Sequence, residues 1–208
     1  MDAIQSSHAK LLARDLLALT ARPSCSSSSD PLTFSTRGGR PVSRAEAVGV
    51  VVTRDRRDKF LRFLLDDGTG CVPCILWLNY HHLLRLPAEG AAAAPAPIPR
   101  HLVGRSPSEI EMLGRVAEGH AERALLGALV RVRGRVTAYR GAVQLTVDGV
   151  AVERDPNAEA LHWLQCFRLA RRCYGMLPSP PPRPPPTGEF HPVTHASSVT
   201  VNKRKVPI

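Results

Sequence analysis

The chain has 208 residues, with 28 lysines and arginines against 18 acidic residues, which gives a formal net charge of +10 at pH 7. A basic excess of this size favours an anionic partner such as nucleic acid, and the length suffices for one folded domain with additional tails. No apolar stretch is long enough to span a membrane, so a membrane protein is not expected. The five cysteines are an odd number, which favours a reducing compartment over a disulfide scaffold.

Residues 1–41 are expected to form an N-terminal helix followed by a loop. Within them, residues 8–20 place Leu12, Leu16 and Leu19 on one face of a short amphipathic helix. The stretch that follows, SCSSSSD, has the composition of a loop.

Residues 42–153 predict a β domain. Apolar alternation indicates five strands, at about 44–54, 58–66, 71–78, 129–139 and 142–152. Between the third and fourth strands lie a low-complexity insertion near 87–100 and a helix that begins with the capping box Ser106, Pro107 and Glu109. Three strands, a helix and two further strands match the order of the OB-fold, a mainly β, five-stranded Greek-key barrel that often binds oligonucleotides.

A second helix follows the fifth strand and occupies residues 154–177, with Asp155 as its expected N-cap. Its apolar stripe is too wide for a helix exposed to water and consists of Leu161, Trp163, Leu164, Phe167, Ala170, Tyr174 and Leu177. The stripe either covers the end of the barrel or binds a partner, and its aromatic residues favour the partner. Residues 178–208 are rich in proline and are expected to be disordered.

The third strand contains the motif CVPCILWLN, in which two cysteines precede a tryptophan. Because alternate residues of a strand face opposite sides, Cys74 joins the apolar core row while Cys71 and Trp77 share the outer face. The two cysteines therefore point apart, and no second Cys-x-x-Cys pair is present to complete a zinc site. This pattern favours a structural core cysteine over a metal or redox site. Trp77 either caps the barrel or stacks on an unpaired base.

The fourth strand, LVRVRGRVTAY, alternates between two faces, one of them small and apolar and the other mostly basic. The basic face carries Arg131, Arg133, Arg135 and Tyr139. Arginines that end in an aromatic residue suit a surface that tracks phosphates and stacks a base. Lys59 and Arg62 on the second strand are further candidates for DNA contact. Solvated outer faces of strands are usually polar, so a purely structural role for each arginine is the alternative.

The sequence shows no recognisable catalytic arrangement. Asp66 and Asp67 fall in a tight turn, where aspartate is expected for its hydrogen bonds to the backbone. Neither a His-Glu-x-x-His motif nor a glycine-rich phosphate loop before a helix occurs. We therefore expect a binding protein that is not an enzyme and that uses no cofactor or metal.

Four segments together resemble the Stn subunit of the telomere-capping CST (Ctc–Stn–Ten) complex, namely RDLLAL, DDGTGCVPCILWLN, VRVRGRVTAYRG and ERDPNAEALHW. This family is similar to the middle subunit of replication protein A, and the resemblance spans about residues 8–177. The chain ends without the paired winged-helix region that animal and fungal members carry. It therefore resembles the short, single-OB plant form.

The resemblance implies a nuclear protein at telomeres that binds single-stranded, G-rich DNA, caps chromosome ends and supports C-strand fill-in by DNA polymerase α–primase. It also implies two protein partners, the small Ten subunit, bound through the barrel and C-terminal helix, and the large Ctc subunit. The family's DNA-facing aromatic positions correspond to Trp77 and Tyr139, whereas Thr137 stands where animal members have an arginine. The alternative is a scaffold that binds protein partners while other subunits hold most of the DNA.

Overall fold

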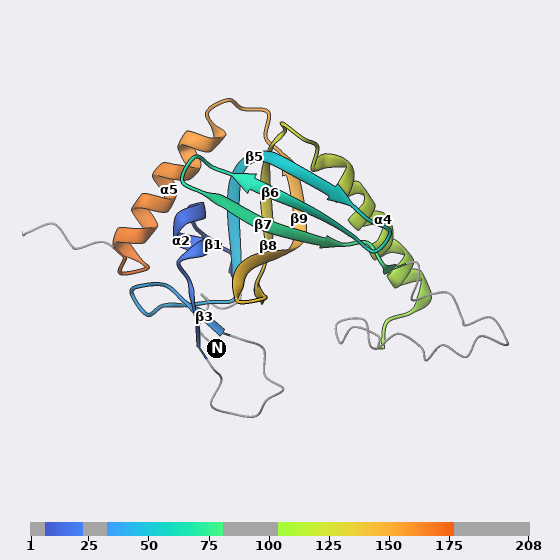
Figure 1. The fold of residues 1–208 in the computed structure, drawn as a ribbon, viewed down its shortest axis with the longest axis horizontal. Helices are drawn as coiled ribbons and strands as arrows, with labels where there is room; N and C mark the ends of the chain where they lie inside the picture. The colour runs from blue at the N-terminus through green and yellow to red at the C-terminus, as the bar shows by residue number, and fades with distance from the viewer. Residues whose placement is uncertain (1–6, 23–32, 81–103, 177–208) are drawn as a thin grey trace, which may run out of the picture. The chain divides into compact units, whose positions relative to one another are not determined.

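Five strands close into a barrel in the computed structural model, which describes residues 7–22, 33–80 and 104–176 (Figure 1). All of these residues belong to one compact unit, Met1–Pro178. The low-complexity insertion expected near 87–100 and the proline-rich tail lie outside the described residues. The barrel strands are β5 (Arg44–Arg56), β6 (Phe60–Asp66), β7 (Cys71–Trp77), β8 (Leu129–Tyr139) and β9 (Ala142–Val152).

The strand order of the barrel is β5-β6-β7-β9-β8, and an antiparallel ladder between β5 and β8 closes it. β7 and β9 pair in parallel, with Cys74 opposite Leu145, whereas the other barrel pairs are antiparallel. This five-stranded Greek-key arrangement is the OB-fold. The fold class predicted from the order of elements is therefore confirmed.

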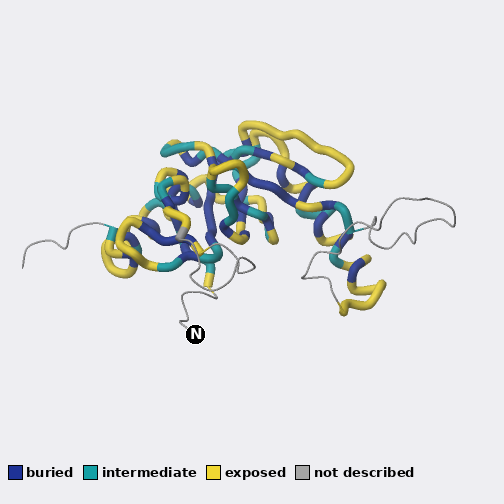
Figure 2. Tube along the Cα trace, turned by 60° about the horizontal axis from the view of Figure 1, so that its bottom comes forward, coloured by how far each residue is buried: buried dark blue, intermediate teal, exposed yellow. Residues whose placement is uncertain are grey.

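The barrel interior is filled by every second residue of each strand, as the alternation predicts. Figure 2 shows the buried positions concentrated in the strands of the barrel. The inner row of β8 consists of Val130, Val132, Gly134 and Val136. Gly134 leaves room for a close neighbour, because a Cβ atom there would lie 2.4 Å from the Thr146 carbonyl oxygen. Cys74 is 3% exposed in the same core, so its predicted structural position is confirmed.

The helix between the third and fourth barrel strands is α4 (Pro107–Arg123), and it begins with the predicted capping box. The Ser106 hydroxyl accepts a hydrogen bond from the Glu109 amide at 3.3 Å, and the Glu109 carboxylate accepts one from the Ser106 amide at 2.8 Å. The helix lies beside β7 and β9, where Ala117 and Ala121 join the barrel core (Figure 1). Within the described ranges, no helix has the length and apolarity needed to cross a membrane.

The helix predicted over residues 8–20 is wrong in its extent, because α2 spans only Ala13–Leu17. Before it, β1 (Ala9–Lys10) runs parallel to β5. The carboxylate of Asp67, in the turn between β6 and β7, accepts a hydrogen bond from the Ala13 amide at 2.7 Å and fixes the start of the helix. The predicted apolar face is nevertheless buried, with exposures of at most 5% for Leu12, Leu16 and Leu19.

A small second sheet, which the sequence did not predict, lies within the region expected to be a loop. Its strands, in the antiparallel order β2-β3-β4, are β2 (Thr20–Arg22), β3 (Thr33–Ser35) and β4 (Pro41–Val42). Phe34, at the centre of β3, is 1% exposed and packs in the same core as the barrel residues. This apolar anchor explains why the segment before the barrel is folded onto it.

The last described helix, α5 (Ala158–Arg172), packs against β1 and β5, on the other side of the barrel from α4 (Figure 1). Its N-cap is Asn157 rather than the predicted Asp155, whose carboxylate accepts a hydrogen bond from the Asn157 amide at 2.8 Å. The buried side of this helix and the turn after it consists of Ala158, His162, Cys166, Ala170 and Tyr174. One side of α5 therefore covers the chain's own strands.

Candidate nucleic-acid interface

Aromatic and cationic side chains gather on the outer surface of β6, β7 and the turn between β8 and β9. We call Phe60, Arg62, Trp77, Tyr139 and Arg140 the aromatic patch. Phe60 pairs directly with Trp77 across the two strands, and their rings meet edge to face at 6.0 Å. The Arg62 guanidinium lies 5.0 Å from the centre of the Phe60 ring and 5.3 Å from that of Tyr139. This cation therefore joins the two sides of the patch.

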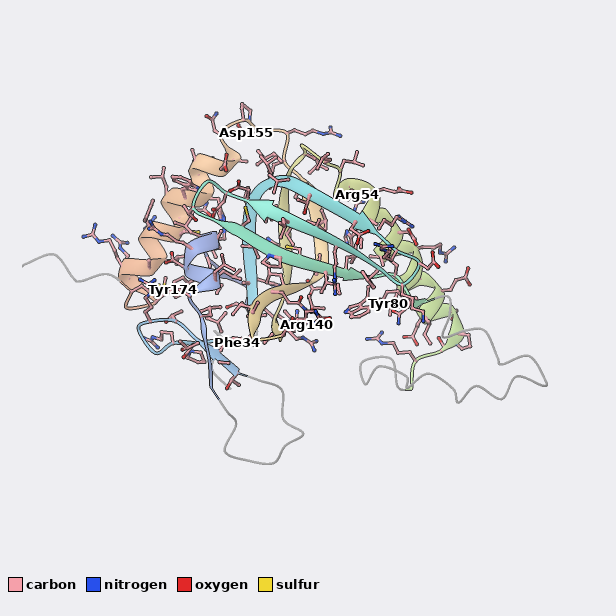
Figure 3. The ribbon with its side chains drawn as sticks, viewed as in Figure 1. Phe34, Arg54, Tyr80, Arg140, Asp155 and Tyr174 are labelled. Carbon is pink, nitrogen blue, oxygen red and sulfur yellow. The ribbon has the colours of Figure 1, made fainter. Side chains whose placement is uncertain are left out.

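The turn between β8 and β9 adds a second arginine to the patch. Arg140 and Gly141 both have positive φ angles, of 52° and 81°, as a two-residue type I′ hairpin requires. A non-glycine residue is uncommon in this conformation, and here it places the Arg140 guanidinium 5.3 Å from the centre of the Tyr139 ring. Figure 3 shows Arg140 at the tip of this hairpin. Sequence reasoning missed Arg140, although the dipeptide Arg-Gly between two alternating strands marked the turn.

The aromatic rings of the patch are open to solvent. Trp77 is 41% exposed and Tyr139 is 45% exposed, so both have ring surface on which a base can stack. A cavity of about 390 Å³ opens beside Tyr139, and Arg62 also forms part of its wall. On general grounds, the face of the second and third strands and the hairpin between the fourth and fifth are where OB-folds bind oligonucleotides.

Three cations at this face are available for phosphate. Among the described residues, no carboxylate pairs with Lys59, Arg62 or Arg140. Arg57 differs from them, because its guanidinium lies 3.1 Å from the Asp55 carboxylate. The structure brings together three of the predicted DNA-binding residues, Arg62, Trp77 and Tyr139. Lys59 is exposed in the turn before β6, where its carbonyl oxygen accepts a hydrogen bond from the Leu78 amide.

Arg131 and Arg133 lie away from the patch and are engaged by the chain's own carboxylates. Glu46 on β5, which is 2% exposed, accepts hydrogen bonds from Arg131 at 2.7 Å and from Arg133 at 2.6 Å. Arg131 also donates to Glu153 at 2.5 Å. Arg131 and Arg133 are therefore less available to an anionic ligand than the arginines of the aromatic patch. The sequence analysis did not consider Glu46, whose position opposite Arg133 depends on the register between β5 and β8.

Glu46 also connects the barrel to α5. Lys10 on β1 lies 3.5 Å from its carboxylate and donates to the Gln165 side chain on α5 at 2.5 Å. Burial alone would raise the pKa of Glu46, but hydrogen bonds from Arg133 and Arg131 outweigh it and hold that pKa below its usual value. We call Lys10, Glu46, Arg131, Arg133 and Glu153 the charge network. It holds an ionised carboxylate where β1, β5 and β8 meet.

The two cysteines of the Cys-x-x-Cys motif do not form a pair. Cys71 is exposed and Cys74 is buried, as expected for opposite faces of β7. Burial raises the pKa of the Cys74 thiol and raises that of Cys166 to about 12, which disfavours the reactive thiolate. Over residues 7–22, 33–80 and 104–176, no three histidine, cysteine or acidic side chains come close enough to hold a metal ion.

The predicted partner-binding stripe of α5 divides between the two sides of the helix. Ala170 and Tyr174 are buried against the chain itself, which narrows the surface open to a partner. Trp163 is half-buried, and its indole nitrogen has no hydrogen-bond partner among the described residues. Leu177 lies outside them. The open side of α5 consists of Leu161, Leu164 and Phe167, which are 50%, 65% and 36% exposed.

The strand order and the closed barrel define the class of protein, an OB-fold domain. A chain of the solved S. pombe Stn1–Ten1 complex superimposes with a TM-score of 0.52 at 15% identity, covering 78% of this chain and 90% of that one. A chain of a replication protein A heterotrimer bound to ssDNA gives 0.50 at 14% identity, covering 78% and 93%. At these identities the structural likeness shows the fold alone.

Sequence comparison identifies the family. The chain is 44% identical over 171 residues to CST complex subunit STN1 of Arabidopsis thaliana, covering 82% of this chain and 94% of that protein. It is 26% identical over 178 residues to STN1 of Homo sapiens, covering 84% of this chain but 44% of the human protein. No protein-family model matches. The chain belongs to the STN1 family of CST complex subunits, which confirms the predicted family and a non-enzymatic role.

Proposed function

We propose that this STN1-family chain binds single-stranded, G-rich telomeric DNA through the aromatic patch. The observation that carries the proposal is the position of Arg62 between the rings of Phe60 and Tyr139, with the Phe60 ring edge to face against the exposed Trp77. In the proposed complex, Trp77 and Tyr139 stack on bases, while Lys59, Arg62 and Arg140 contact phosphates. The replication protein A structure that shares the fold holds ssDNA, which supports this choice of ligand.

The aromatic contact is tested by Trp77→Ala. We expect its affinity for a single-stranded oligonucleotide to fall by about 1–3 kcal/mol, roughly 5- to 150-fold, because one base loses its stacking surface. Fluorescence anisotropy with a labelled telomeric strand measures this loss. Leu126→Ala is the matched control, because Leu126 is 66% exposed in the turn after α4 and lies outside the patch. Equal affinities of wild type and Trp77→Ala would remove Trp77 from the interface.

The wider function follows from assembly. In our proposal the small Ten subunit binds the open side of α5, formed by Leu161, Leu164 and Phe167, and the large Ctc subunit completes the complex. The solved S. pombe relative of this fold is a complex of Stn1 with Ten1, which supports that partner. The complete assembly would act in the nucleus at telomeres, capping chromosome ends and supporting C-strand fill-in by DNA polymerase α–primase.

A second candidate function, a protein scaffold, rests on the charge network. Two of the three outward arginines of β8, Arg131 and Arg133, are paired with the chain's own carboxylates. These two arginines are therefore less available to DNA phosphates than the sequence suggests. In that case other subunits would hold most of the DNA, and the aromatic patch would contribute little to its affinity.

A further inference from the structure

A second cavity, of about 480 Å³, opens at the same end of the barrel as the β8–β9 hairpin. Figure 3 shows Phe34, on its wall, at the same end of the barrel as Arg140. Its size falls within the range of ligand sites in proteins. The polar residues of its wall are Thr33, Ser43, Arg44, Arg135 and Thr137.

The two arginines of this cavity form a like-charge pair. Arg44 on β5 is directly opposite Arg135 on β8, so their side chains leave the same face of the sheet. Like charges in that position repel and destabilise a sheet. The next pair along the same face is Glu46 with Arg133, where the chain supplies a buried counter-charge. The chain therefore neutralises Arg133 with a carboxylate, whereas Arg135 faces another arginine.

The ion pair between Arg44 and Asp148 is weak. Asp148, the extra residue in the bulge of β9, lies 3.7 Å from Arg44, and both side chains are exposed, by 46% and 39%. An ion pair of this kind contributes little in water. Arg135 has no carboxylate partner in the part of the chain that the structure describes. Two exposed guanidinium groups on one cavity wall are therefore available to a single anion.

The ladder between β5 and β8 ends beside the cavity. The Val136 amide donates to the Ser43 carbonyl oxygen at 2.9 Å, and β5 begins at the next residue, Arg44. Ala138 lines the cavity. Two guanidinium groups on one wall suit a phosphodiester oxygen better than a neutral ligand.

The cavity and the aromatic patch are linked along β8, which contributes side chains to both. Arg135 and Tyr139 share a face of β8 and are four residues apart, which is about 13 Å along a strand. Across the sheet, the register runs from Arg62 to Ile75, from Ile75 to Thr146 and from Thr146 to Arg135. Single OB-folds occupy roughly 4–16 nucleotides of a strand, so a bound strand is long enough to reach both places.

We propose that Arg44 and Arg135 bind a backbone phosphate of the same single strand whose bases stack on Trp77 and Tyr139. This inference rests on the proposed function, which it extends by a second contact point for the strand. The site recognises a phosphodiester, not a base, because Phe34 on its wall is 1% exposed and offers no ring for stacking.

The test compares wild type with Arg44→Gln/Arg135→Gln on telomeric oligonucleotides of increasing length. The variant should bind the shortest strands, which cover only the aromatic patch, as wild type does. On longer strands we expect a 3- to 10-fold loss, and a slope of log affinity against log salt that is smaller by about 0.7 for one lost phosphate. The variant should fold at least as well, because substitution relieves the repulsion between the two arginines.

Arg168→Gln/Arg171→Gln is the control, since it removes the same charge from two exposed arginines of α5. Equal affinities of wild type and Arg44→Gln/Arg135→Gln at every length would overturn the second contact, while a loss in Trp77→Ala would still support the proposed function. If neither Arg44→Gln/Arg135→Gln nor Trp77→Ala lost affinity at any oligonucleotide length, both the second contact and the proposed function would be contradicted. If inorganic phosphate, added at constant ionic strength, competed equally well with oligonucleotides of every length, Arg44 and Arg135 would bind free phosphate. That result would also overturn the proposal.

Discussion

Glu46→Gln should lower the free energy of unfolding by about 3 kcal/mol, because it leaves Arg131, Arg133 and Lys10 without their shared counter-charge. The loss should lie at the lower end of the range for broken buried ion pairs, since Arg133 is 53% exposed and water screens part of its charge. Urea denaturation followed by circular dichroism measures it. Because the network joins β1, β5 and β8, the transition midpoint should shift as one cooperative step.

Glu118→Gln is the matched control, since Glu118 forms an ion pair of 2.6 Å with Arg56 at the exposed surface. It should cost less than about 1 kcal/mol. The pKa of Glu46 is lowered in the folded state, so its stabilisation is complete above the usual value of 4.5 and is lost as the pH falls through the lowered pKa. The difference between wild type and Glu46→Gln should therefore shrink below about pH 4.5. Equal losses in both variants at pH 7 would contradict a special role for the buried network.

Leu164→Glu should weaken assembly with the small Ten subunit by more than about 100-fold, because it places a charge at the centre of the open side of α5. Leu164 is 65% exposed and contacts water in the isolated chain, so folding should be unaffected. Isothermal titration calorimetry with the purified partner measures the change.

Leu126→Glu provides the control for this surface, because it introduces the same charge at a leucine of similar exposure in the turn after α4. It should leave assembly unchanged. Without the partner, Leu164→Glu should bind single-stranded DNA as wild type does, because the aromatic patch lies on β6, β7 and the β8–β9 turn and not on α5. Normal assembly of Leu164→Glu would place the partner elsewhere on the chain.

The barrel could be predicted because its strands alternate strongly. Val130, Val132 and Val136 occupy one side of β8, and only one register buries all of them. The same alternation correctly placed Trp77 and Tyr139 on the exposed side. The order of strands and helix then selected the OB-fold from the topologies available to five strands.

Features that depend on contacts between distant segments could not be predicted. The apolar spacing of Leu12, Leu16 and Leu19 suggested a helix over residues 8–20, but α2 is shorter because Ala9 pairs with Ala45 and the Ala13 amide donates to the Asp67 carboxylate. These partners are more than thirty residues away along the chain. Local periodicity does not contain that information.

The partners of the outward arginines of β8 could not be predicted either. Arg131, Arg133 and Arg135 look alike in sequence, yet the register between β5 and β8 gives Arg133 a glutamate and Arg135 another arginine. On α5, the wide apolar stripe contained both the residues that cover the barrel, such as Ala170, and those that remain open, such as Leu164. A sequence pattern indicates that a face is apolar, but not which of two surfaces it contacts.

The central claim is that the aromatic patch binds a single strand of DNA. Its most direct test is a titration of telomeric single strands at low and moderate salt on wild type and Trp77→Ala/Tyr139→Ala, each alone and with the small Ten subunit. We predict that wild type binds alone and that the double variant loses about 100-fold, as two stacking surfaces imply. If neither chain binds until the partner is added, and both then bind equally well, the patch is not the DNA site and the chain is a scaffold.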